Sequence, residues 1–171
     1  MTALELDDVG ASHSDPLSVL EYCCSERDWA YERDNNDELI VAAPGSWNAY
    51  QLRAFWHRDD QVVQLACMLD IRVPDGKRAA IYETLGLINE RLWLGHFEMW
   101  AQDGSILFRH AIVMDDEDDG ISLSSSQAHT ILESIVAECE RYYPVFQFVL
   151  WAGKRPAEAM EAALLDPQGE A

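Results

Sequence analysis

The chain has 171 residues, of which 12 are Lys or Arg and 31 are Asp or Glu, so its formal net charge is −19. A surface of this charge repels phosphate backbones and anionic lipid headgroups, and we expect neither nucleic acid nor a membrane surface as a partner. With 49% hydrophobic and 25% charged residues, the composition is that of a globular protein, and the length suits one domain.

The two ends of the chain differ from its middle. Residues 1–14 are rich in Asp, Ser and Gly, which predicts a disordered acidic leader, and residues 166–171 are expected to fray. Residues 15–165 then form the single domain. Because the leader lacks the basic start and the apolar run of a secretory signal, we expect a cytoplasmic protein, with its four cysteines as free, reduced thiols.

The first half of the domain is predicted to contain a helix followed by four strands. Asp15 is the expected N-cap, and Pro16 fits the first position of a helix that ends near residue 26. The four strands are expected at residues 29–33, 39–43, 47–57 and 61–71. In the last of these, every second residue from Val63 to Ile71 is apolar, which is typical of a half-buried strand.

The next segment is predicted to be a helix and a hairpin. An apolar stripe at helical spacing indicates the helix and consists of Ile81, Leu85, Ile88 and Leu92. Strands at 97–101 and 106–112 follow, joined by Asp103 and Gly104 as a two-residue type I′ turn. With that turn, Glu98 lies opposite Arg109 on the neighbouring strand.

Two helices are expected at the end of the domain. Ser124, Ser125 and Ser126 are candidate N-caps for the first, whose stripe consists of Ile131, Ile135, Cys139 and Tyr142. Pro144 is expected to end or kink this helix, and Pro156 to open a last helix that reaches about residue 165. The whole pattern predicts an α+β fold, with an antiparallel sheet of about six strands and helices packed on one face.

Five short motifs resemble a known family. They are Leu85-Gly-Leu-Ile-Asn89, Leu94-Gly95-His96-Phe97-Glu98, Phe108-Arg109-His110, Tyr142-Tyr143-Pro144 and Trp151-Ala152-Gly153-Lys154. Their order and spacing across residues 15–165 are similar to those of the YbjN family of small bacterial proteins, often described as sensory transduction regulators. The resemblance implies a fold like that of type III secretion chaperones, which often dimerise, and it implies no established reaction.

The leading hypothesis for function is a non-catalytic, cytoplasmic protein-binding module, either chaperone-like or regulatory. Trp93, Trp100 and Leu107 are the candidate partner-binding residues, because they place apolar side chains on the face expected to point away from the core. Such a surface also predicts a homodimer. A purely structural, self-associating protein is a third reading.

The alternative is a small enzyme or ligand-binding protein that uses His96, Glu98 and Arg109. No catalytic motif completes such a site, and we expect no cofactor.

Two patterns imitate metal sites. The acidic run 115–120 begins like an EF-hand but has Ser126 at the twelfth position, and His129 with Glu133 lacks a third ligand, so we expect no bound metal.

Overall fold

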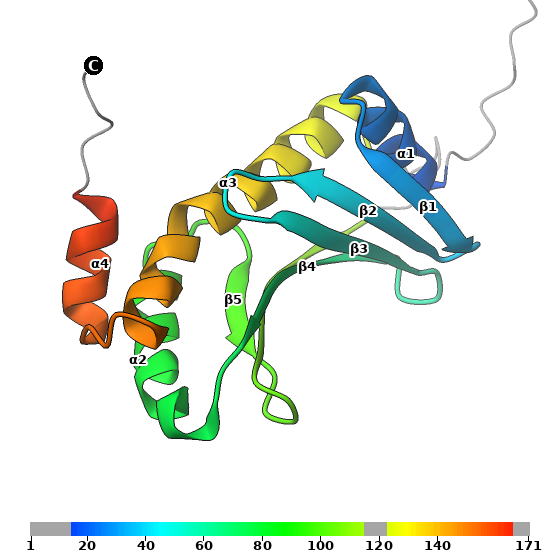
Figure 1. Ribbon diagram of the computed structural model, residues 1–171. Coiled ribbons are helices and arrows are strands. Elements are labelled where there is room, and N and C mark those ends of the chain that lie inside the picture. Colours follow the sequence, from blue (N-terminus) through cyan, green and yellow to red (C-terminus); the bar gives the residue numbers. More distant parts are fainter. Residues whose placement is uncertain (1–14, 115–122, 166–171) are drawn as a thin grey trace, which may run out of the picture.

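The computed structural model describes residues 15–114 and 123–165 (Figure 1). The predicted leader, the EF-hand-like run and the predicted tail lie outside these residues. In chain order the elements are α1 (Pro16–Glu26), β1 (Ala30–Asn35), β2 (Glu38–Pro44), β3 (Ala49–His57), β4 (Val62–Arg72), a 3-10 turn (Asp75–Lys77), α2 (Arg78–Asn89), β5 (His96–Met99), β6 (Ser105–Val113), α3 (Ser125–Leu150) and α4 (Pro156–Leu164). This is the predicted order of helices and strands.

The six strands form one antiparallel sheet in the order β1-β2-β3-β4-β6-β5. The alternation predicted for β4 is confirmed, because every second side chain from Val63 to Ile71 is buried. The chain leaves β4, passes through α2 to the far edge to form β5, and returns through β6 to pair with β4. The α+β fold is therefore as expected.

The helices cover one face of the sheet, and α3 runs across it between α1 and α2 (Figure 1). Local sequence sets where they begin. The N–H of Leu17 donates to the Asp15 side chain (3.3 Å), and Ser124 forms a capping box with Gln127 at the start of α3. α4 packs against α2 and α3.

Of the two effects expected of Pro144, an end or a kink, the first does not occur, since α3 continues to Leu150. Proline removes one backbone donor, which on a free helix favours termination. Here the turn after Pro144 buries Val145, Phe146 and Val149 in the core, and this burial holds the helix together beyond the proline.

The predicted hairpin register is wrong by two residues. Glu98 lies opposite Leu107, and His96 lies opposite Arg109, so the loop has four residues, from Ala101 to Gly104. Gly104 adopts a φ of 74°, and its carbonyl accepts a hydrogen bond from the N–H of Val73 (2.9 Å). This contact with the end of β4 selects the longer loop. A shift of two residues keeps every side chain on its predicted face.

The core lies between the sheet and the helical layer. Its largest fully buried side chains include Tyr50, Phe97, Phe108, Tyr142 and Phe146. All four cysteines are buried and free, as the sequence predicts. No helix in the described residues is both long and apolar enough to cross a bilayer.

Candidate functional site

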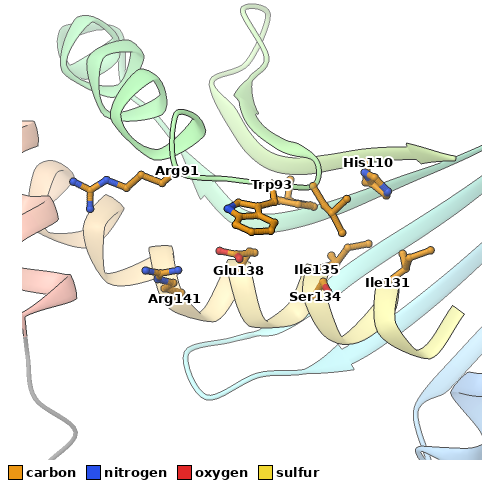
Figure 2. A pocket seen from close by; sticks show the side chains of 10 residues that line it. Arg91, Trp93, His110, Ile131, Ser134, Ile135, Glu138 and Arg141 are labelled. Atoms are coloured by element: carbon orange, nitrogen blue, oxygen red, sulfur yellow. The ribbon is translucent and has the colours of Figure 1, made fainter. Parts of the chain in front are cut away.

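A groove runs between α3 and the outer edge of β6. One end is a cavity of about 300 Å³, with Phe108 and Ile135 from the core on its walls and Trp93 at its rim (Figure 2). A second cavity of about 470 Å³ continues from it and shares Leu94, His110 and Ile131. We call the two cavities together the α3–β6 groove, which is lined by residues of the segments 91–94, 108–113 and 123–141.

The segment between α2 and β5 forms one wall of this groove because it contains a glycine. Gly95 has a φ of 66°, and a Cβ atom at this position would lie 2.4 Å from the Phe108 ring and 2.7 Å from the carbonyl oxygen of Arg109. Only glycine allows so close an approach in this conformation. The approach holds Trp93 and Leu94 beside β6 and opposite α3.

The outer edge of β6 is only half covered by β5. β5 pairs with β6 from Ile106 to Arg109, whereas β4 pairs with β6 as far as Val113. The N–H of Met114 donates to the carbonyl of Gln61, next to β4 (2.8 Å). Because successive residues of a strand point their N–H groups to opposite sides, the N–H and C=O groups of Ala111 and Val113 face away from β4. No strand in the described residues pairs with them there.

The outer edge of β5, in contrast, is closed by the end of α2. The N–H of Phe97 donates to Asn89 Oδ1 (2.8 Å), and Asn89 Nδ2 donates to the carbonyl of Phe97 (2.9 Å). The side-chain amide thus takes the place of a neighbouring strand. On β5 the outward-facing backbone groups of Phe97 are therefore paired, whereas those of Ala111 and Val113 on β6 pair with no described strand.

Exposed apolar side chains gather along the groove. Trp93 is 99% exposed, and Leu94 is also exposed. His110 lies between the two cavities and is half-buried. Burial lowers the pKa of His110, and nearby His96 lowers it further, so the groove favours the uncharged form of this imidazole.

The three predicted partner-binding residues lie in different places. Trp93 lies at the groove. Trp100 follows the other end of β5, is 43% exposed, and its indole N–H donates to Glu98 Oε1 (3.0 Å). The expectation that Leu107 is exposed is wrong, since it is fully buried. It lies on the predicted face, but its neighbours across the sheet, Met68 and Glu98, help to enclose it.

His96, Glu98 and Arg109, the residues of the enzyme alternative, do lie together on the sheet face away from the helices. Both carboxylate oxygens of Glu98 are occupied, because Oε1 accepts from Arg109 and Trp100 and Oε2 lies 3.1 Å from His96 Nε2. None of these three residues lines the α3–β6 groove. The cluster is a set of paired surface side chains, without a carboxylate held free for acid or base chemistry.

His129 and Glu133, the two candidate metal ligands on α3, each pair with a different residue at the end of α1. His129 Nε2 lies 2.8 Å from a carboxylate oxygen of Glu26, and Glu133 forms an ion pair with Arg27 at 2.6 Å. These pairs tie α3 to α1. Across residues 15–114 and 123–165, no group of three potential metal-ligating side chains occurs.

The groove was not predicted, although one signal for it is present in the sequence. The sequence pattern indicates two strands of nearly equal length for this hairpin, but the observed β5 is four residues long and β6 is nine. Gly95, immediately before β5, is the signal in the sequence that regular strand pairing ends there.

These features define an α+β protein with one six-stranded antiparallel sheet, a helical layer on one face and a groove at a partly open sheet edge. A model of the YbjN family, described as "putative bacterial sensory transduction regulator", matches residues 16–148. The chain belongs to the YbjN family. That description is of a regulator and names no reaction.

Comparison with solved structures supports the same fold. The crystal structure of YbjN from E. coli, described as a putative transcription regulator, matches with a TM-score of 0.51 and 11% sequence identity, covering 75% of this chain and 92% of that chain. At this identity the likeness shows the fold alone. No curated protein matches the sequence significantly. The expected similarity to type III secretion chaperones is not tested by these comparisons.

Proposed function

We propose that this protein is a non-catalytic, cytoplasmic binding module that takes an extended segment of another protein into the α3–β6 groove. The observation that carries the proposal is the backbone edge at Ala111 and Val113, which no described strand covers and which lies directly beside an apolar groove. The description of the family as a regulator supports a role in binding.

An uncovered strand edge is a template for another strand. The N–H and C=O groups of Ala111 and Val113 would pair with the backbone of the segment, which gives affinity with little dependence on sequence. Alternate side chains of the segment would enter the groove toward α3, where Ile112 and Ile131 lie. The sheet would gain a seventh strand over a short length.

Trp93 is the expected anchor of the complex. A large aromatic side chain left fully exposed beside a cavity buries much apolar area when a partner covers it. The net charge of −19 also favours a segment flanked by basic residues, because the field of the protein speeds its approach. Added salt should then slow association more than it speeds release.

The test uses peptides selected from a phage-displayed random library against the full-length chain. Replacement Trp93→Ala should weaken binding of the selected peptides about 30-fold, as is typical of an interface hot spot. Trp151→Ala is the matched control, because Trp151 is also exposed but lies at the end of α3, away from the groove. Trp100→Ala, His96→Ala and Glu98→Ala should change binding little.

Two results would contradict the proposal. If Trp100→Ala weakened binding and Trp93→Ala did not, the binding surface would be the sheet face beside β5. If His96→Ala abolished a turnover by the purified protein while folding persisted, the non-catalytic reading would fail.

The predicted homodimer is a separate proposal, and its support is the exposed Trp100, which lies outside the α3–β6 groove. Sedimentation of the full chain at micromolar concentration should give a mass near twice the 19.4 kDa of one chain. A mass of one chain that does not vary with concentration would contradict the homodimer.

A further inference from the structure

The end of the α3–β6 groove nearest α2 carries two arginines. Arg91 comes from the segment after α2 and Arg141 from α3, and both line the cavity of about 300 Å³. Figure 2 shows the two at one end of this cavity and His110 with Ile131 at the other. Ile131 and Arg141 are about 15 Å apart along α3, at 1.5 Å per residue, so the groove has an apolar end and a basic end.

Both guanidinium groups are available to a ligand. Most arginines of this acidic protein form ion pairs, but in the part of the chain that the structure describes neither Arg91 nor Arg141 does. Arg141 lies over the ring of Tyr142, at 5.3 Å from its centroid. Two unpaired guanidiniums at one cavity end favour an anionic group, since arginine matches the geometry of a carboxylate.

Glu138 lies between the arginines and the apolar end and lacks a partner of its own. Its Oε2 atom is buried, and no hydrogen bond reaches it within the described residues. A buried acceptor without a donor is costly, and a ligand that brings an N–H group would relieve this cost. The cavity end therefore suits a ligand that carries both an anion and a nearby N–H donor.

The order of the strands also fixes where an added strand must end, which is at this end of the groove. A strand that pairs with Ala111 and Val113 cannot continue along β6 past Arg109, because β5 occupies the edge from that residue on. If it runs antiparallel to β6, as every neighbouring pair of this sheet does, its carboxyl end lies toward the cavity with the two arginines.

We propose that the basic end of the groove binds the free C-terminal carboxylate of the partner segment. Arg91 and Arg141 hold the carboxylate, Glu138 Oε2 accepts the last peptide N–H, and the apolar C-terminal side chain packs against Phe108 and Ile135 beneath Trp93. The inference rests on the proposed function and narrows its partner to proteins whose exposed C-termini end in an apolar residue.

The experiment displays random heptapeptides on phage in two formats, one with free C-termini and one with the same peptides placed internally. Selection on the full-length chain should enrich the free C-terminal format, with apolar final residues. The enriched peptide is then synthesised as the free acid and as the C-terminal amide, and binding of both is measured by fluorescence polarisation. The amide should bind about 10- to 100-fold more weakly, because it cannot form the charge-assisted hydrogen bonds.

Variants of the protein locate this effect. Arg141→Gln and Arg91→Gln should each weaken binding of the acid about tenfold or more and leave binding of the amide nearly unchanged. Arg72→Gln is the matched control, because it removes the same charge from an exposed arginine outside the groove and should leave both unchanged.

The outcomes separate the two proposals. Peptides from the internal format that bind equally well and depend on Trp93 would overturn the C-terminal inference and leave the proposed function intact. Equal loss of acid and amide binding in Arg141→Gln would also overturn it. If neither format gave peptides sensitive to Trp93→Ala, both proposals would fail.

Discussion

The two halves of one sheet edge, β5 and the end of β6, differ in whether their outward-facing backbone groups are paired. Along β5, the side chain of Asn89 pairs with both backbone groups of Phe97. Along β6 beyond Arg109, no described strand or side chain pairs with Ala111 and Val113 in this way. Under the proposed function, an edge that is closed on one side and left open beside an apolar groove on the other serves as a selective binding surface.

The largest effect on stability is expected at Gly95, where the chain approaches β6 just before β5. Gly95→Ala should lower the free energy of unfolding by about 2–4 kcal/mol, because it combines a positive φ with a clash against Phe108. Urea unfolding followed by circular dichroism measures the effect. Gly86→Ala is the control: in α2 a Cβ at Gly86 meets nothing within 4 Å, and this change should raise stability by about 0.5–1 kcal/mol. Equal effects of the two changes would refute the role of Gly95.

Asn89→Ala should open the β5 edge. Phe97 would lose both partners of its backbone groups, and the free energy of unfolding should fall by about 1–3 kcal/mol. Hydrogen exchange gives the local readout, in which the amide of Phe97 exchanges faster than in the unaltered protein. An unchanged exchange rate would mean that Asn89 does not close this edge.

On the open half, removal of a donor should affect binding more than folding. Val113→Pro deletes an N–H that faces away from β4, so the free energy of unfolding should change by less than about 1 kcal/mol. Binding of the library-selected peptide should weaken about tenfold, since one backbone hydrogen bond and the local fit are lost. Val113→Ala retains the N–H and serves as the control. Unchanged peptide binding in Val113→Pro would argue against strand addition.

The smallest effect concerns pH and His110. Because burial lowers the pKa of His110 in the folded protein, the unfolded chain takes up its proton first, below about pH 6.5. The stability contributed by the neutral imidazole is complete above that pH and is lost as the pH falls through the window below it. Urea unfolding at pH 7.5 and 5.5 should therefore show a smaller difference in His110→Gln than in the unaltered protein. A similar reduction in His57→Gln, which alters an exposed histidine, would show that His110 is not the cause.

The hairpin shows what alternation can and cannot predict. The faces of Glu98 and Arg109 follow from a period of two and are as predicted. Their register does not follow, because Asp103 and Gly104 suit a two-residue turn when considered alone. The hydrogen bond from Val73 to Gly104, thirty-one residues further along the chain, fixes the longer loop instead.

Leu107 shows the same limit for a single side chain. Its place on the face away from the helices is readable from the pattern, but its complete burial depends on neighbouring strands. Conversely, Trp93 was identified as a surface residue, and only the structure places it beside His110, Ile131 and Glu138, which come from β6 and α3.

The sequence by itself determined the helices and strands, their faces and most of their ends, because these depend on periodicity and on local caps such as Asp15 and Ser124. The tertiary structure alone decided where the sheet edge is open. That feature arises from the unequal lengths of β5 and β6 and from the close approach of Gly95 to Phe108. Both depend on how separate segments pack together, which local sequence patterns do not encode.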